Sequence, residues 1–176
     1  SVAIADIDAS LSPSGTDSQW IIDAFPLELA ALLLLMGSLG DRYGRRALLE
    51  VGLGVLVVAR VWLAVVHTSH GAIAARGLAG LGAALAFPGT LATITATFPP
   101  ERRSRGISVW TAAAVIGSFL GVVFAGVLIS VFSWRAIGWG TAVLAASVLV
   151  VTRLSVKESR AEERVRIDLV GSALVT

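Results

Sequence analysis

The chain contains five long apolar stretches that follow one another with only short polar connections between them. An α-helix rises about 1.5 Å per residue, so roughly 20 apolar residues are needed to cross a hydrocarbon core about 30 Å thick. Closely spaced spans of this length predict an all-α integral membrane protein whose helices pack as a bundle. We expect the spans at 19–39, 47–66, 71–97, 106–131 and 136–152, with a partial first helix at 1–11 and a further helix beginning near Asp168.

Composition agrees with a lipid environment and narrows the chemistry. Of the 176 residues, 56% are hydrophobic and only 15% are charged, which is too apolar for a water-soluble domain of this length. Cysteine is absent and the two histidines, His67 and His70, have no further ligands beside them, so we expect no metal and no cofactor. The arginines lie in short clusters instead of one continuous basic face, which argues against nucleic acid as a partner.

Lysine and arginine gather in alternate connections. Eleven of them follow the second, fourth and sixth expected helices, counting 1–11 as the first, and only Arg135 lies in the connections between. Because Lys- and Arg-rich connections stay in the cytoplasm, this distribution predicts a multi-pass protein of a cell membrane, in particular the bacterial cytoplasmic membrane. The eleven residues are Arg42, Arg45, Arg46, Arg102, Arg103, Arg105, Arg153, Lys157, Arg160, Arg164 and Arg166.

The first basic connection, 37–46, runs Gly-Ser-Leu-Gly-Asp-Arg-Tyr-Gly-Arg-Arg. Gly37 and Gly40 allow two helix ends to approach closely, and Gly44 permits a tight reversal of the chain. Asp41 can cap the following helix or bind an arginine. An ordinary basic loop needs arginines to obey the topology rule, but it does not need this spacing of glycine and aspartate.

The same connection resembles the loop Gly-x-Leu-x-Asp-Arg-x-Gly-Arg-Arg between the second and third helices of the major facilitator superfamily. That resemblance implies a cytoplasmic gate centred on Asp41 and surrounded by arginines. The gate residues it assigns are Gly37, Asp41, Arg42, Gly44, Arg45 and Arg46.

A second motif lies in the expected span 71–97. Arg76, Gly80 and Gly82 resemble the fourth-helix Arg-x-x-x-Gly-x-Gly motif of this superfamily, whose arginine is associated with proton transfer. Independently of any family, an arginine inside a membrane is costly and needs a partner or water. The alternative is that Arg76, about 8 Å from the outer end of its span, extends its side chain to the interface.

The expected span 106–131 carries small residues at Gly117, Gly121 and Gly126. They resemble the fifth-helix motif Gly-x-x-x-Gly-Pro-x-x-Gly-Gly of antiporters in the superfamily, except that Val122 replaces the proline and Ala125 a glycine. A seam for close helix packing is retained, but the proline kink is not. A purely structural Gly-x-x-x-Gly seam is therefore an equal alternative to an antiport motif.

Segment 12–23, which ends in Gln-Trp-Ile-Ile-Asp, is similar to the outer loop and second-helix start of fourteen-helix drug:proton antiporters of the quaternary-ammonium-compound resistance type. Segments 132–135 and 167–171 resemble the same branch. The resemblance implies the amino-terminal six-helix bundle of a major facilitator fold at 1–153 with an incomplete first helix, and a missing carboxy-terminal half of the same transporter. It further implies a cytoplasmic linker at 154–167 and the start of a seventh helix at 168–176.

The charged residues inside expected spans include Asp23, Glu28, Arg60 and Arg76. Each costs on the order of 3 kcal/mol or more in hydrocarbon unless it faces a cavity or a partner. Asp23, Arg60 and Arg76 lie at similar depths, about 6 to 9 Å inside the outer boundary, so they could form one polar cluster. Asp23 is the first candidate for proton coupling or substrate binding and Glu28 the second; alternatively, Asp23 is a hydrated helix-start residue.

These features favour proton-coupled efflux of amphipathic, cationic drugs by alternating access, with a small-molecule substrate, protons and the lipid bilayer as partners. Two alternatives remain: a truncated or degenerate fragment that inserts without transporting, and a major facilitator carrier of another small solute. We expect no enzyme, because the sequence offers no nucleophile with a base, no paired-carboxylate site and no metal set.

Overall fold

The computed structural model describes residues 4–155, apart from the side chains of residues 4, 41, 92, 93 and 95–97. The linker expected at 154–167 and the helix expected at 168–176 therefore lie almost wholly outside the described residues. The described part is all-α and contains no strand, as the sequence predicted. Its helices are α1 (Ile4–Leu11), α2 (Gly15–Tyr43), α3 (Arg45–Val65), α4 (Ser69–Thr97), α5 (Pro100–Val131) and α6 (Trp134–Ser155).

Five of these helices, α2 to α6, are long and apolar enough to cross a membrane, which confirms the five expected spans. All five begin before the expected span, and α2 and α5 do so by four residues or more. α2 starts at Gly15 because Ser14 forms a capping box, in which the Ser14 hydroxyl accepts a hydrogen bond from the Asp17 amide at 3.1 Å and the Asp17 carboxylate accepts one from the Ser14 amide. α5 starts at Pro100, whose fixed φ suits the first helical position and carries the basic turn into the helix.

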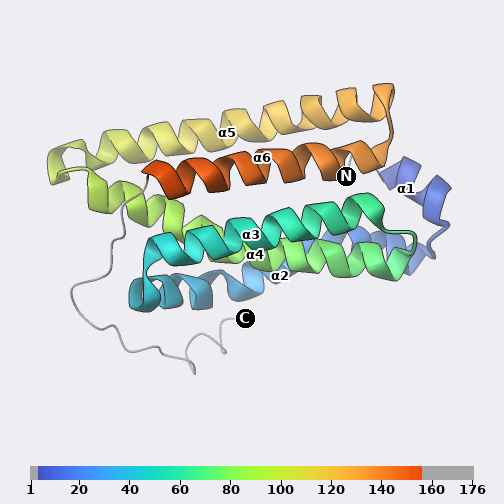
Figure 1. Ribbon diagram of the computed structural model, residues 1–176, viewed down its shortest axis with the longest axis horizontal. Helices are drawn as coiled ribbons and strands as arrows, with labels where there is room; N and C mark the ends of the chain where they lie inside the picture. Colours follow the sequence, from blue (N-terminus) through green and yellow to red (C-terminus); the bar gives the residue numbers. More distant parts are fainter. Residues whose placement is uncertain (1–3, 156–176) are drawn as a thin grey trace.

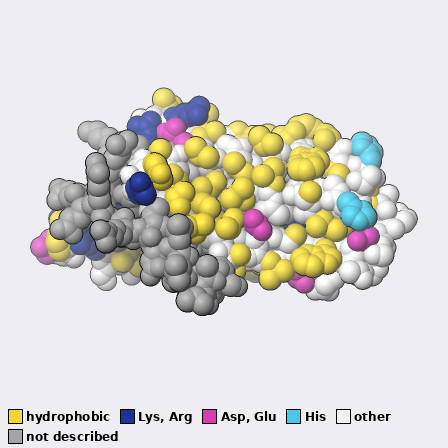
Figure 2. Space-filling view, turned by 90° about the horizontal axis from the view of Figure 1, so that it is seen from below, with side chains coloured by type: hydrophobic (Ala, Val, Ile, Leu, Met, Phe, Trp, Pro, Cys, Tyr) yellow, Lys and Arg dark blue, Asp and Glu magenta, His cyan; other side chains and the backbone are white. Residues whose placement is uncertain are grey.

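The long helices lie side by side and alternate in direction (Figure 1). α4 packs extensively against both α2 and α3, and α3 packs against α6, whereas α5 makes few contacts with the rest. The connections at Gly44 and at Phe98–Pro99 share one end of the bundle with the close of α6. Lysine and arginine gather toward one end of the molecule in Figure 2, the histidines lie at the other, and hydrophobic side chains cover much of the surface between.

The end of the bundle away from Gly44, expected to be the outer one, is held by a small apolar cluster in which α1, α2, α3, α4 and α6 all take part. Trp134 at the start of α6 is buried, and its indole Nε1 donates a hydrogen bond to the Ser10 hydroxyl of α1 at 2.8 Å. Arg135 donates to the backbone carbonyl of Val66 at 3.0 Å. These bonds fix α1 and the α3–α4 turn to the start of α6.

Close packing of α3 on α4 depends on two glycines that face each other. A Cβ added to Gly52 would lie 2.7 Å from the Gly82 carbonyl oxygen, and one added to Gly82 would lie 2.9 Å from the Gly52 carbonyl oxygen. Both contacts involve backbone atoms, which cannot turn aside as a side chain can. Glycine is therefore required on both helices for the backbones to approach this closely.

We expect Gly82→Ala to lower the stability of the intact protein in detergent by about 1–3 kcal/mol, because the new methyl group overpacks the α3–α4 contact. Gly77→Ala on the same helix is the matched control, since a Cβ there meets nothing within 4 Å. Its effect should be neutral or stabilising by up to about 1 kcal/mol through helix propensity. Thermal unfolding of the two variants measures the difference, and equal stabilities would contradict the packing argument.

Candidate transport site and cytoplasmic gate

Arg76 of α4 donates hydrogen bonds to the backbone of α2. Its Nε lies 2.8 Å from the Ile21 carbonyl oxygen and its Nη2 lies 3.0 Å from the Ile22 carbonyl oxygen. Proline has no amide hydrogen, so Pro26 leaves the carbonyl of Ile22, four residues earlier, without its normal helical donor. Arg76 supplies the missing donor, and it does so by crossing to α2 instead of extending its side chain to the interface.

Arg60 of α3 approaches the same region from another side. Its guanidinium carbon lies 5.8 Å from the centre of the Phe25 ring, and that of Arg76 lies 5.5 Å from the same centre. An aromatic face attracts a cation, which offsets part of the cost of placing each arginine in a span. The expected clustering of Arg60 with Arg76 is present, and Phe25 is the residue between them.

Asp23 does not join the two arginines. Its carboxylate accepts a hydrogen bond from Gln19 Nε2, one turn earlier on α2, at 2.5 Å. Within the described part of the chain it forms no ion pair with Arg60 or Arg76. Asp23 is half-buried at the outer end of α2, so the three-residue cluster expected from equal depths is reduced to its two arginines. Depth alone could not fix this, because it says nothing about the direction in which each side chain points.

Glu28 lines a groove of about 620 Å³ between α2 and α4. Its side chain is half-buried, and the wall opposite is made of small residues such as Ala74 and Gly77. α2 approaches α4 closely here, since a Cβ on Gly80 would lie 2.6 Å from the Phe25 carbonyl oxygen and 2.8 Å from the Glu28 Cβ. The exposed Trp20 ring also lines the groove. Glu28 thus presents a carboxylate to an otherwise apolar groove.

The predicted gate turn joins α2 to α3 through Gly44. This residue has φ of 110°, a conformation that favours glycine, and its amide donates to the Gly40 carbonyl at 3.0 Å. Gly37, Gly40 and Arg45 line a cavity of about 170 Å³ together with residues of α3 and α4. Arg42 is exposed and lies over the neighbouring Tyr43 ring. The side chain of Asp41 lies outside the described part of the structure.

Glu50 of α3 is a functional candidate that the sequence analysis missed. Its carboxylate forms ion pairs with two arginines. Arg46 Nε, from the gate turn, lies 2.7 Å from one carboxylate oxygen, and Arg153 Nε, from the last turn of α6, lies 3.3 Å from the other. Arg46 Nη2 also donates to the Arg153 carbonyl at 3.0 Å. This network ties the gate turn to the end of α6. The i, i+4 spacing of Arg46 and Glu50 was a visible signal for the first pair, but the contact to α6 was not.

The glycines at 117, 121 and 126 of α5 do not pack against another helix of the described structure. A Cβ added to any of the three meets nothing within 4 Å, and no residue of α5 is buried. The seam is therefore available, but no described residue occupies it.

The Major Facilitator Superfamily model matches residues 1–172. The chain belongs to this superfamily. Its members are transporters, so the prediction that the chain is no enzyme is confirmed, and with the five spans the chain is a multi-pass membrane protein. A crystal structure of the peptide transporter POT in complex with sulfate matches with a TM-score of 0.72 and 19% identity over 82% of this chain and 30% of that one. That likeness confirms the fold.

Curated relatives narrow the similarity to drug-resistance transporters, as the sequence resemblance predicted. Multidrug resistance protein Stp of Mycobacterium tuberculosis is 32% identical over 98% of this chain and 32% of its own length. Methyl viologen resistance protein SmvA of Salmonella typhimurium is 38% identical over 77% of this chain and 28% of its own length. Multidrug efflux pump LfrA of Mycolicibacterium smegmatis is 36% identical over 90% of this chain and 32% of its own length. The chain thus spans about a third of the length of the curated relatives it matches.

The contact between Arg76 and the Pro26 turn predicts an energetic coupling. In the intact protein, Arg76→Met should cost about 1–3 kcal/mol, because the Ile22 carbonyl loses its donor in an apolar region. Combined with Pro26→Ala, which restores an amide hydrogen at that position, the same change should cost less by about 1 kcal/mol or more. Unfolding measurements on a double-mutant cycle give this coupling.

Arg60→Met is the matched control for that cycle. Its guanidinium contacts the Phe25 ring but makes no hydrogen bond to α2 within the described residues. Its cost should therefore be the same with and without Pro26→Ala. Equal coupling for Arg60 and Arg76 would show that the carbonyl is not the reason for the position of Arg76.

Proposed function

We propose that the intact protein exports amphipathic cationic compounds across the cytoplasmic membrane in exchange for protons. The groove between α2 and α4 carries this proposal, because it combines a carboxylate, Glu28, with the exposed ring of Trp20 and apolar walls. A carboxylate and an aromatic face both attract an organic cation, and the apolar lining accepts its hydrocarbon part. The names of relatives such as the methyl viologen resistance protein support this direction, since methyl viologen is a cation.

Proton exchange requires a carboxyl group that binds either a proton or the cation. Asp23 and Glu28 are the two carboxylates of α2 within the expected span, and they lie about one and a half turns apart. Asp23, held by Gln19 at the outer end, remains our first candidate for proton coupling, and Glu28 faces the groove. A cation that binds only the ionised carboxylate competes with the proton, which couples the two movements.

Alternating access supplies the movement between the two sides. In this scheme the helices of this chain rock as a unit against the remainder of the transporter, and the gate turn around Asp41 closes the cytoplasmic side. The network of Arg46, Glu50 and Arg153 supports a unit motion, because it joins the gate turn to α6.

A second candidate function is carriage of an anionic solute. It is favoured by Arg60 and Arg76, whose guanidinium groups share the Phe25 ring and which form no ion pair with a described carboxylate. In that case the two arginines, and not Glu28, would face the solute.

Cells that express the intact protein should extrude ethidium or a quaternary ammonium dye, and a protonophore should stop extrusion. Asp23→Asn should abolish extrusion, because an amide cannot exchange a proton, and Glu28→Gln should weaken dye binding by about tenfold. Dye efflux from preloaded cells, with membrane abundance measured in parallel, tests Asp23→Asn, and a dye-binding titration of the purified intact protein tests Glu28→Gln.

Glu101→Gln is the matched control, since this exposed carboxylate lies at the cytoplasmic start of α5, away from the groove. It should leave efflux unchanged. Full efflux by Asp23→Asn at normal abundance would remove Asp23 from the mechanism. Loss of anion transport on Arg60→Met, together with no dye efflux at all, would favour the second function.

A further inference from the structure

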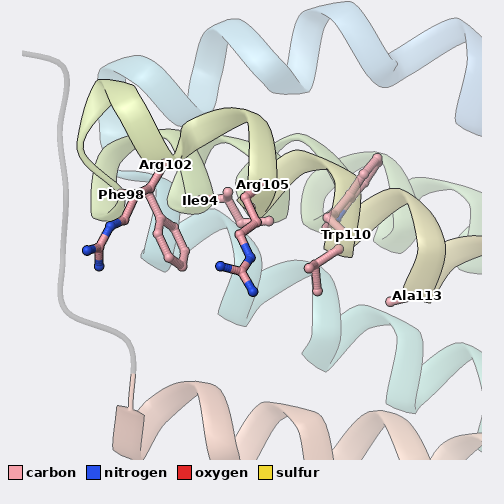
Figure 3. Close-up of a pocket in the computed structure, with 8 residues that line it drawn as sticks. Ile94, Phe98, Arg102, Arg105, Trp110 and Ala113 are labelled. Atoms are coloured by element: carbon pink, nitrogen blue, oxygen red, sulfur yellow. The ribbon is translucent and has the colours of Figure 1, made fainter.

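A second groove, of about 590 Å³, lies at the cytoplasmic end of the bundle where α4 meets α5 (Figure 3). One wall is a single face of α5, in which the lining residues recur at helical spacing. The other wall is the end of α4. The residues are Ile94 and Phe98 of the α4 end, and Arg102, Arg105, Gly106, Val109, Trp110 and Ala113 of α5.

The walls of this groove are held in place. Trp110 donates through Nε1 to the Thr90 hydroxyl at 3.2 Å, and its ring meets that of Phe87 edge-on with centroids 5.4 Å apart. Gly106 lets α5 approach the end of α4 closely, because a Cβ there would lie 2.8 Å from the Ile94 side chain. The groove is therefore built by packing between two helices.

The charged side chains of the groove do not reach its far end. Figure 3 shows the guanidinium group of Arg102 at one end of the groove and that of Arg105 nearer the middle, with Trp110 and then Ala113 toward the other end. Neither guanidinium group forms an ion pair or a hydrogen bond with the described residues, and the lining contains no carboxylate. The free charge is thus positive, and its complement is an anion.

The length and direction of the groove define the ligand further. From Arg102 to Ala113 the helix rises about 16 Å, from the basic cytoplasmic turn into the apolar part of the span. Arginines at the cytoplasmic interface meet the negative phosphates of the inner leaflet, and the apolar wall below them lies at the depth of acyl chains.

We propose that this groove binds one anionic phospholipid of the inner leaflet. The phosphate lies between Arg102 and Arg105, and an acyl chain runs along Phe98, Val109 and Ala113 beside the Trp110 ring. An acidic peptide would use the two arginines but would leave the apolar length of the groove empty. A free phosphate would leave it empty as well.

The intact protein, purified in a mild detergent and delipidated, is titrated with dioleoyl phosphatidylglycerol and, separately, with dioleoyl phosphatidylcholine and inorganic phosphate. Native mass spectrometry counts bound lipid, and the melting temperature reports stabilisation. We expect one phosphatidylglycerol to bind and to raise the melting temperature, with phosphatidylcholine at least about tenfold weaker and inorganic phosphate without effect.

Three variants locate the site. Arg105→Gln should weaken phosphatidylglycerol binding about tenfold, whereas Arg103→Gln should not, because Arg103 lies outside the groove and donates to the Phe98 carbonyl. Ala113→Phe fills the apolar end without changing charge and should weaken binding as much as Arg105→Gln.

Five outcomes would overturn the proposal. The first four are absence of bound phosphatidylglycerol, equal binding of the two lipids, equal stabilisation by inorganic phosphate, and equal losses in Arg103→Gln and Arg105→Gln. Retained binding by Ala113→Phe would place the lipid elsewhere and would also overturn it. None of these outcomes depends on dye efflux, so failure here is separable from failure of the proposed transport.

Discussion

The structure depends on one constraint: inside a bilayer every backbone amide and carbonyl needs a partner within the protein. Long helices meet it with their own hydrogen bonds, and α2 departs from it at Pro26. Arg76 of the neighbouring helix α4 donates the missing hydrogen bond to the Ile22 carbonyl, although its own charge would be unfavourable in a span. Two costly features, a proline in a span and an arginine in a span, thus offset each other.

α4 is the helix around which the others assemble. Arg76, Gly80 and Gly82 fall within two turns and contact two different helices: Arg76 and Gly80 contact α2, and Gly82 contacts α3. The motif that resembled a proton-transfer signature is therefore also a packing motif. Other small residues of α4, Ala74 and Gly77, line the groove that Glu28 faces.

The number of spans could be predicted from the sequence, because it follows from hydropathy along the chain. The orientation and the gate turn, which rest on charge and glycine spacing, stay predictions. The sequence did not predict where Arg76 points, because its partners are backbone carbonyls of another helix, including that of Ile22, which Pro26 leaves without a helical donor. The pairing of Glu50 with Arg153 joins residues 103 positions apart, which no local pattern reveals. Asp23 was placed with the arginines by depth, but its direction depends on Gln19, one turn away on its own helix. For Gly117, Gly121 and Gly126 of α5, the structure offers no described partner to explain them.

The link between Arg46, Glu50 and the carbonyl of Arg153 has a mechanical consequence. It connects the reversal after α2 to the inner tip of α6, so α3 and α6 cannot slide past each other at that end without breaking charged hydrogen bonds. α5 has no comparable tether and few contacts with its neighbours. A tilting motion would therefore carry α3 and α6 together as a stiff pair, while α5 could shift its angle at much smaller energetic cost.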